Sequence, residues 1–377
     1  MKTKKIIWCI QQLDHIGGTE QVSIDLMNSL VSFYQIVLVS TAKIDASNIV
    51  YKLDPRIETV SLNVPSEIVR LDQSLASALS SHRYFKYLSY LFRAFYYYFI
   101  KRFSLRKKVR KLQSEGSVVI SSSLDSYFYA PKKGRVIFHY HFDQNHFLSK
   151  GERFCFKIAP KPNQFIFLTK SYYEDIKSKL PKLNATYIYN PVRFSSVKNL
   201  DYKGNSLVFV GRFSEQKDPL LALKVAKKLK DDNFPFSLKM FGEGHLKTQM
   251  EEYLISNHLE DCVSICPPSK DIKNEFLNAD MLLFTSAYEG HPLVLLEARS
   301  LSRPVVLNRY NRSVDEICED NYDSLVVDSR DENEFASRIE ETFSDLEQLK
   351  RLKANCYESS LKFSKEEIVE RWKKLLG

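Results

Sequence analysis

Two glutamates, Glu289 and Glu297, lie in the run TSAYEGHPLVLLEARS. The apolar residues before Thr285 predict a strand, and the turn that follows leads to a helix beginning near Pro292. The first amide groups of such a helix have no intrahelical partner and lie at the positive end of the helix dipole. A diphosphate is therefore a natural ligand for this helix start.

The spacing of the two glutamates bears on what they could do. Glycosidases place two carboxyl groups roughly 5–10 Å apart across one scissile bond. Eight helical residues span about 12 Å along a helix axis, so Glu289 and Glu297 suit two separate hydroxyl-binding roles better. The alternative is structural, with one carboxylate on a loop surface and the other paired with a lysine on a helix.

A second candidate group is the cationic pair Arg212 and Lys217, which follows the predicted strand Leu207–Val210. Asp218-Pro219 then has the pattern of a helix N-cap with a proline in the first turn. A guanidinium and an ammonium beside a helix start could hold a diphosphate. Taken alone, the two cations are equally well explained as solvated loop residues.

The elements around these residues alternate between strand and helix in both halves of the chain. In the first half, the Gly17-Gly18 loop lies between a strand and a helix predicted for Glu20–Val31. The predicted strands are Ile6–Ile10, Gln35–Ser40, Ser117–Ser121, Arg135–Phe142, Gln164–Leu168, Leu207–Val210, Phe236–Phe241, Ala279–Thr285 and Pro304–Asn308. Such alternation predicts an α/β protein of two doubly wound, Rossmann-like domains facing a central cleft.

Three stretches together resemble one enzyme family. EGHPLVLLEA is similar to the E-x7-E signature of the family 4 retaining glycosyltransferases (glycosyltransferases group 1), which have the GT-B fold. LVFVGRFSEQKDPLLALKVAKKL resembles the strand, Arg/Lys loop and helix of that family, and HIGGTEQVSIDLMNSL its N-terminal glycine loop. The resemblance is specific over residues 205–345 and weaker beyond residue 40 of the first half.

The resemblance implies a role for each candidate residue. Arg212 and Lys217 would hold the donor diphosphate and stabilise the leaving nucleotide in place of a metal. Glu289 would bind sugar hydroxyls near the reacting carbon, and Glu297 the ribose. The implied donor-binding set is Gly18, Arg212, Lys217, Glu289, Gly290, His291, Pro292, Leu293, Val294 and Glu297, with amides of Leu293 and Val294 on phosphate oxygens and no metal or cofactor.

A histidine is expected to complete the catalytic set of Glu289, Arg212 and Lys217. His139 and His141 lie two residues apart in a strand-like run, so their side chains should share a face. His141 is nearer the end of the strand, and we take it for the histidine that the family places close to the donor sugar. A buried core histidine is the alternative, and no spaced motif supplies the further ligand that a zinc site requires.

Some positions depart from the family pattern. His291 stands where relatives often have an aromatic residue, which bears on sugar selectivity. Arg303 replaces the usual glycine before the PVVLN strand, and the loop Arg309–Ser313 lacks its usual glycine. None of these changes removes a proposed catalytic group.

These observations predict transfer of a hexose or N-acetylhexosamine from a UDP-sugar to a glycan or lipid-linked acceptor, in cell-surface polysaccharide biosynthesis. The expected domains are an acceptor-binding domain (1–194), a linker (195–204), a nucleotide-sugar domain (205–360) and a C-terminal helix (361–377) that packs back on the first. One alternative is a catalytically silent, nucleotide-binding regulatory protein of the same fold. A Rossmann oxidoreductase is disfavoured because no GxGxxG follows the first strand.

Charge is distributed unevenly over the 377 residues. The net charge is +9, but residues 1–200 carry +16 and the rest −7. Residues 83–111 hold ten Lys and Arg among many aromatic residues, and no acidic residue lies between Asp72 and Glu115. This composition predicts peripheral contact with an anionic membrane; nucleic acid, which we do not expect as a partner, and a core helix with solvated cations are the alternatives.

Cysteine usage and hydropathy bear on location. The six cysteines form no CxxC pair, which is typical of free thiols in a reducing compartment. Behind its lysines the N-terminus has an apolar run too short for a secretory signal, and no segment offers the ~20 apolar residues of a spanning helix. We therefore expect a cytoplasmic protein on the inner face of the cell membrane.

Overall fold

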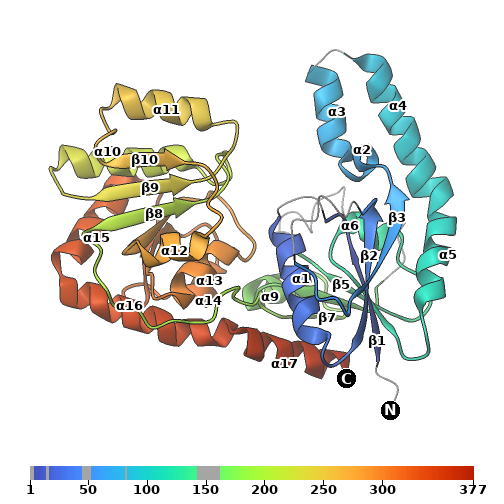
Figure 1. Cartoon of the computed structure of the whole chain (residues 1–377). Coiled ribbons are helices and arrows are strands. Elements are labelled where there is room, and N and C mark those ends of the chain that lie inside the picture. The colour runs from blue at the N-terminus through green and yellow to red at the C-terminus, as the bar shows by residue number, and fades with distance from the viewer. Residues whose placement is uncertain (1–3, 14–16, 45–51, 81–82, 142–161) are drawn as a thin grey trace. The chain divides into compact units, whose positions relative to one another are not determined.

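The computed structural model describes residues 4–13, 17–44, 52–80, 83–141 and 162–377. The chain divides into two compact units (Figure 1). The N-terminal unit comprises Met1–Tyr189 with Val369–Gly377, and the C-terminal unit comprises Asn190–Ile368.

The N-terminal unit is built on a parallel sheet whose described strands have the order β3-β2-β1-β4-β5-β6-β7. Its elements are β1 (Lys5–Ile10), α1 (Gly18–Leu30), β2 (Gln35–Ala42), β3 (Glu58–Val64), α2 (Ser66–Val69), α3 (Leu71–Ser80), α4 (Tyr84–Phe95), the π-helical turn η2 (Tyr96–Lys101), α5 (Arg102–Leu112), β4 (Val118–Ser121), α6 (Leu124–Phe128), β5 (Arg135–His139), β6 (Gln164–Phe167), α9 (Lys170–Lys179) and β7 (Ala185–Tyr187).

The C-terminal unit, described throughout, repeats the same plan with the strand order β10-β9-β8-β11-β12-β13, again all parallel. Its elements are β8 (Ser206–Val210), α10 (Pro219–Asp231), β9 (Ser237–Phe241), α11 (Lys247–Ser256), β10 (Val263–Cys266), α12 (Ile272–Leu277), β11 (Met281–Phe284), α13 (Leu293–Ser300), β12 (Val305–Asn308), α14 (Val314–Ile317), β13 (Ser324–Val327), α15 (Glu332–Ser344), α16 (Leu346–Ser360), the 3₁₀ turn η3 (Leu361–Phe363) and the start of α17 (Lys365–Leu376).

Both sheets have the doubly wound order of a Rossmann-like domain, in which the chain direction across the sheet reverses once. The reversal lies between β1 and β4 in the N-terminal unit and between β8 and β11 in the C-terminal unit. The α/β class and the two doubly wound sheets expected from the sequence are confirmed. Ligands of such sheets bind beyond the carboxyl ends of the strands at the reversal.

The strands predicted from the sequence are those inside the two sheets. β1, β2, β4, β8, β11 and β12 are largely apolar runs with nearly every residue buried. The strand expected over Arg135–Phe142 ends at His139 instead, and Phe142 lies outside the described residues. Four strands were not predicted, β3, β7, β10 and β13, and each lies at an edge of its sheet.

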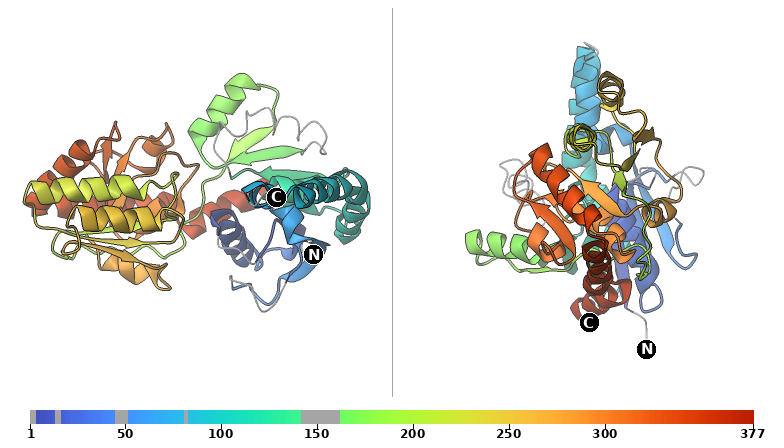
Figure 2. Two further views of the ribbon diagram at one scale, coloured as in Figure 1. Left: turned by 90° about the horizontal axis from the view of Figure 1, so that it is seen from above. Right: turned by 90° about the vertical axis from the view of Figure 1, so that its left-hand side faces the viewer.

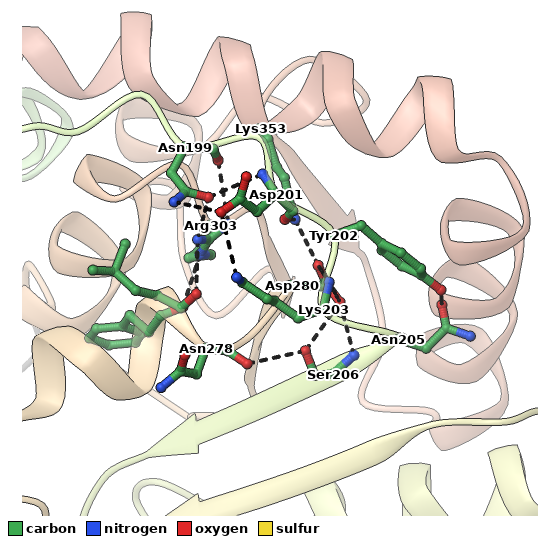
Figure 3. A network of polar contacts seen from close by, with 12 residues as sticks. Asn199, Asp201, Tyr202, Lys203, Asn205, Ser206, Asn278, Asp280, Arg303 and Lys353 are labelled. Carbon is green, nitrogen blue, oxygen red and sulfur yellow. Dashed lines mark hydrogen bonds and ion pairs between the residues drawn. The ribbon is translucent and has the colours of Figure 1, made fainter.

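Residues 195–204, expected as a linker, belong to the C-terminal unit, where a polar network holds them (Figure 3). Asp280 forms a fully buried ion pair with Lys353 at 2.7 Å and accepts hydrogen bonds from the Lys203 and Ser206 amides. Lys353 also donates to the Asp201 carbonyl at 2.5 Å. The segment is therefore fixed to its own sheet by buried charges.

Arg303, which replaces a family glycine, belongs to the same network. It is fully buried and donates to the carbonyl of Phe276 and to the side chain of Asn199, at 2.9 and 2.8 Å. Its guanidinium therefore serves structure, tying segment 199–206 to α12.

The last helix, α17, crosses the division between the units, since its residues from Val369 on belong to the N-terminal unit. Trp372 is fully buried and its ring lies 5.3 Å from that of Trp8 in β1. Arg135 of β5 donates to the Leu375 carbonyl at 2.6 Å. Among the described residues, no helix has the length and apolar character needed to cross a membrane.

Candidate functional site

The loops that follow β8 and β11 leave the C-terminal sheet at its reversal point. Residues 211–217 follow β8 and carry Arg212 and Lys217. Residues 285–292 follow β11 and carry Glu289. The fold thus brings the cationic loop and the first glutamate to the one edge where a doubly wound sheet binds ligands.

Lys217 and Glu289 form an ion pair across this edge. The Lys217 ammonium lies 2.5 Å from Glu289 Oε1, and the two side chains are only 17% and 10% exposed. The same ammonium lies 5.7 Å from the centre of the Phe284 ring, a favourable cation–π position. Two of the residues predicted to act on one donor molecule therefore touch, although 72 positions separate them in the chain.

The backbone at Lys217 is held by its neighbours. Asp218 adopts a left-handed conformation (φ 43°), and its side chain accepts a hydrogen bond from the Leu221 amide, as the predicted N-cap requires. The hydroxyl of Thr285, at the end of β11, donates to the Asp218 carbonyl at 2.8 Å. Arg330 forms an ion pair with the Asp218 carboxylate. These contacts fix the direction in which Lys217 leaves the sheet.

The turn at Glu289 is held from the opposite side. Asn311 donates to the Glu289 carbonyl at 3.0 Å, and Asn190 donates to the His291 carbonyl at 3.1 Å. Asn311 lies in the Arg309–Ser313 loop, which departs from the family pattern by lacking a glycine. These two hydrogen bonds fix the main chain of the turn, from which the Glu289 carboxylate reaches Lys217.

Helix α13 begins at Leu293, one residue later than predicted, with Pro292 as an extended N-cap residue. The amides of Leu293 and Val294 lie in the first turn and therefore have no intrahelical acceptor. No N-cap side chain accepts a hydrogen bond from them either. Glu297 lies one turn further on and is 8% exposed. A buried ion pair between Arg299 and Asp323 anchors the far end of α13.

Arg212 lies beside this arrangement rather than in the ion pair. Its guanidinium is exposed and donates to Gln216 Oε1 at 3.3 Å. Gln216 in turn joins the two loops, since its carbonyl accepts from the Ala287 amide at 2.8 Å and its side chain donates to the Tyr288 carbonyl. Arg212 is thus the exposed cation of the site and Lys217 the partly buried one.

Sequence reasoning missed two glycines that allow the loop after β9 to join the site. A Cβ at Gly242 would lie 1.9 Å from the Gly211 carbonyl oxygen, and one at Gly244 would lie 2.2 Å from that of Phe213. Gly244 also has a positive φ of 158°. The signal was available as G-x-G directly after a strand, in FGEG. Only glycine permits this close backbone approach behind Arg212.

Comparison with known proteins identifies the activity. The sequence model of the glycosyl transferases group 1 matches residues 193–359, which contain the loops after β8 and β11 and helix α13. The chain is a glycosyltransferase.

Relatives of this glycosyltransferase extend the match to the whole chain. It is 26% identical, over 99% of its length and 98% of the relative, to the GalNAc-α-(1→4)-GalNAc-α-(1→3)-diNAcBac-PP-undecaprenol α-1,4-N-acetyl-D-galactosaminyltransferase of Campylobacter jejuni.

Two solved structures share its fold. TarM of S. aureus, in complex with fondaparinux, α-GlcNAc-glycerol and UDP, has a TM-score of 0.78 at 16% identity, covering 99% of this chain and 100% of TarM. HepE of Anabaena in complex with UDP has 0.72 at 14%, covering 99% of both chains. The expected GT-B fold is confirmed.

His291 of this glycosyltransferase is a neutral, buried side chain. Burial, with a smaller effect of the nearby Lys362 charge, lowers its pKa to about 3. Its ring lies 5.6 Å from that of Phe363. The imidazole thus replaces the aromatic residue of relatives as a packing group that carries no charge at neutral pH.

In the N-terminal unit, the glycine loop follows β1 at that sheet's own reversal point. Gly17 is the N-cap of α1, and its carbonyl accepts from the Gln21 amide at 3.0 Å. Gly18 is the first residue of the helix and is exposed. An exposed glycine at a helix start leaves the main chain accessible to an anionic ligand.

The two histidines at the end of β5 face the same way, as predicted. His139 Nδ1 lies 3.1 Å from His141 Nε2, and burial lowers the pKa of both side chains, that of His141 to about 3. His139 is fully buried against Trp372, whereas His141 is half-buried at the surface of its unit. Within the described ranges, no three His, Cys, Asp or Glu residues gather as metal ligands would.

Proposed function

We propose that this chain is a retaining glycosyltransferase that moves a hexose or N-acetylhexosamine from a UDP-sugar to a lipid-linked or other membrane-associated glycan. The observation that carries the proposal is the Lys217–Glu289 ion pair at the reversal point of the C-terminal sheet. It joins a cation for the diphosphate to a carboxylate for the sugar, beside the uncapped start of α13. The C-terminal unit is the donor-binding domain and the N-terminal unit the acceptor-binding domain.

The diphosphate binds Lys217, Arg212 and the amides of Leu293 and Val294. On donor binding, Lys217 exchanges the Glu289 carboxylate for a phosphate oxygen, which releases Glu289 to accept hydrogen bonds from sugar hydroxyls. Arg212, with its exposed guanidinium, turns onto the same diphosphate. The two cations then offset the charge that develops on the leaving nucleotide, without a metal ion.

The remaining candidates position the donor. Glu297, buried on the second turn of α13, accepts hydrogen bonds from the ribose hydroxyls. Gly18 lets the N-terminal glycine loop approach the diphosphate, and His141 contributes its neutral imidazole near the donor sugar. His291 and Gly290 shape the pocket for the sugar ring.

The relatives support the choice of substrates. The TarM and HepE structures, which share the fold over their full length, are complexes with UDP. The Campylobacter relative is named for an acceptor carried on diphospho-undecaprenol. A lipid-carried acceptor also agrees with the basic charge of residues 1–200.

The test is transfer of radiolabelled sugar from a set of UDP-sugars to a solvent-extracted fraction of polyprenyl-diphosphate-linked glycans. Incorporation into that fraction by the wild-type chain, and its loss in Lys217→Ala, is the expected result. Donor binding without transfer or hydrolysis of any UDP-sugar would instead identify a nucleotide-binding protein that lacks turnover.

A further inference from the structure

The helix formed by α4, η2 and α5 exposes many large apolar side chains, and Phe85 is 92% and Phe92 75% exposed. Six of them recur at intervals of three and four, which places these six along one side of the helix. Four more exposed apolar residues, Tyr84, Leu91, Tyr96 and Ile100, each lie next to one of the six in the sequence. We call the six the aromatic stripe: Phe85, Leu88, Phe92, Phe95, Phe99 and Phe103. Exposed apolar side chains gathered on one face mark an interaction surface.

The opposite side of the same helix fixes its rotation. Leu105 and Val109 are buried in the core, and Tyr98 packs against that core and donates to Asp125 at 2.5 Å. Figure 1 and the right-hand view of Figure 2 show α3 and α4 reaching beyond the strands of their own unit. Because the packed side is held, the aromatic stripe is directed away from the sheet of its own unit.

Cations accompany the stripe along its length. The Arg102 guanidinium lies 5.5 Å from the Phe99 ring centre and 5.0 Å from that of Phe103, and Lys101 lies 6.0 Å from Tyr96. Exposed cations continue from the stripe toward the end of α5, namely Lys107, Lys108, Arg110 and Lys111. No acidic residue occurs in the sequence from 73 to 114.

The basic surface also contains a hollow at the start of α4. A cavity of about 300 Å³ between α2, α3 and α4 is lined by Arg70, Arg83 and Lys86 together with serine hydroxyls. Glu67 is its one acidic lining residue and lies 4.0 Å from Arg93. Three cations with hydroxyl donors suit a phosphate group.

We propose that the aromatic stripe docks this protein on an anionic lipid bilayer, with the apolar side chains in the interface and the flanking cations on lipid phosphates. The chemistry is that of an interfacial amphipathic helix, whose aromatic face enters the headgroup region while its basic residues contact anionic lipids. Charge argues against dimerisation through the aromatic stripe, because the cations flanking the stripe in two copies would repel each other without an acidic partner. The proposal concerns where the enzyme works and holds whatever sugar it transfers.

Co-sedimentation of the full chain with lipid vesicles tests the docking surface. Binding should be strong on phosphatidylglycerol-containing vesicles, weak on phosphatidylcholine alone, and should fall as salt is raised. Phe85→Ser with Phe92→Ser should lower vesicle affinity by at least ~10-fold through lost apolar burial. The control is Ile255→Ser, which removes an exposed apolar side chain (61% exposed) from α11. A triple variant that removes flanking cations should weaken binding at low salt: Lys101→Gln, Lys107→Gln and Lys108→Gln. Its control is the double variant Lys132→Gln, Lys133→Gln, which removes two exposed cations elsewhere in the unit and should bind like the wild type.

Fluorescence gives a second, residue-specific readout. Trp8 and Trp372 are fully buried, so their emission should not respond to vesicles. In Phe92→Trp the new indole should shift to shorter wavelength and be quenched by brominated lipid, while Ile255→Trp should show neither effect. Equal vesicle binding by the wild type and the Phe85→Ser, Phe92→Ser variant would overturn the proposal. Dimer dissociation by that variant, in a protein that ignores vesicles, would also overturn it and assign the stripe to self-association.

Discussion

At the scale of single residues, the candidate site centres on the ion pair between Lys217 and Glu289, whose charged atoms lie 2.5 Å apart. Each residue was predicted to bind the donor, but the sequence does not indicate that the two pair with each other. The pairing gives each residue a partner of opposite charge. In the proposed function, donor binding gives Lys217 a phosphate oxygen in place of the Glu289 carboxylate.

Removing either cation should slow glycosyl transfer. Lys217→Ala or Arg212→Ala deletes a charge that is positioned for the leaving diphosphate, so the barrier should rise by at least ~2–3 kcal/mol, roughly 30- to 150-fold in rate. Steady-state turnover with the preferred UDP-sugar measures the change. Lys224→Ala, which removes an exposed cation of α10, is the control and should keep wild-type turnover.

If the two cations replace the metal ion that other glycosyltransferases use, as we propose, transfer should continue in excess chelator. Assays with and without EDTA decide this point. A strict requirement for magnesium or manganese would show that Arg212 and Lys217 do not carry the leaving-group charge.

The two glutamates should separate by what they bind. Glu289→Gln should chiefly reduce turnover and sugar selectivity, whereas Glu297→Gln should chiefly weaken binding of UDP itself. Titration calorimetry with UDP, together with kcat for each variant, distinguishes the roles, and Glu252→Gln on the exposed side of α11 serves as control. An equal loss of UDP affinity in both glutamate variants would refute the division.

Burial of His291 should make stability depend on pH. Its pKa is about 3 in the folded chain against an ordinary value of 6.5, so the folded state favours the neutral ring. The stabilisation is complete above about pH 6.5 and is lost as pH falls toward 3, by up to about 5 kcal/mol. Denaturant unfolding at a series of pH values should therefore show a shallower acid slope in His291→Gln. Val225→Ala, which removes buried apolar groups from the core of the same unit without removing a proton site, should lower stability while keeping the wild-type slope.

At the scale of elements, the sequence predicted the inner strands of both sheets and missed the edge strands. Strands covered on both faces are continuous apolar runs, such as Gln35–Ala42 in β2. β3, β7 and β10 lie at sheet edges and are partly exposed, so their patterns do not differ from those of loops. β13 is buried, but its apolar run, Leu325–Val327, is too short to indicate a strand. The candidate site residues could be proposed from the sequence because they follow inner strands.

The buried network of Figure 3 yields an element-scale prediction. Lys353→Met leaves the Asp280 carboxylate buried without its partner and should reduce the free energy of unfolding by about 3–5 kcal/mol. Removing both charges in D280N/K353M should be less damaging, because no uncompensated charge remains. Lys227→Met, which breaks the exposed pair with Asp231, should change stability by less than about 1 kcal/mol. Urea unfolding of the variants provides the comparison, and a double variant worse than Lys353→Met would contradict this view of the pair.

At the scale of the whole molecule, two units of the same doubly wound plan carry opposite charge. The alternation of strands and helices was enough to predict both sheets, since the same strand–helix pattern repeats along each unit. The sequence could not reveal that residues 199–206 are fixed by Asp280 and Arg303, because those contacts join residues about 75–105 positions apart. Nor could composition alone show that the aromatic residues of α4 are exposed while Tyr98 packs inward.

The most direct test of the central claim follows the sugar released when the enzyme turns over a UDP-sugar in EDTA. Proton NMR of the wild-type reaction should show free UDP together with a sugar that appears first as the α-anomer, before mutarotation. Lys217→Ala should release neither at a comparable rate. A β-anomer appearing first would contradict retention, and the absence of turnover with every UDP-sugar unless a divalent metal is added would contradict the role given to Lys217 and Arg212.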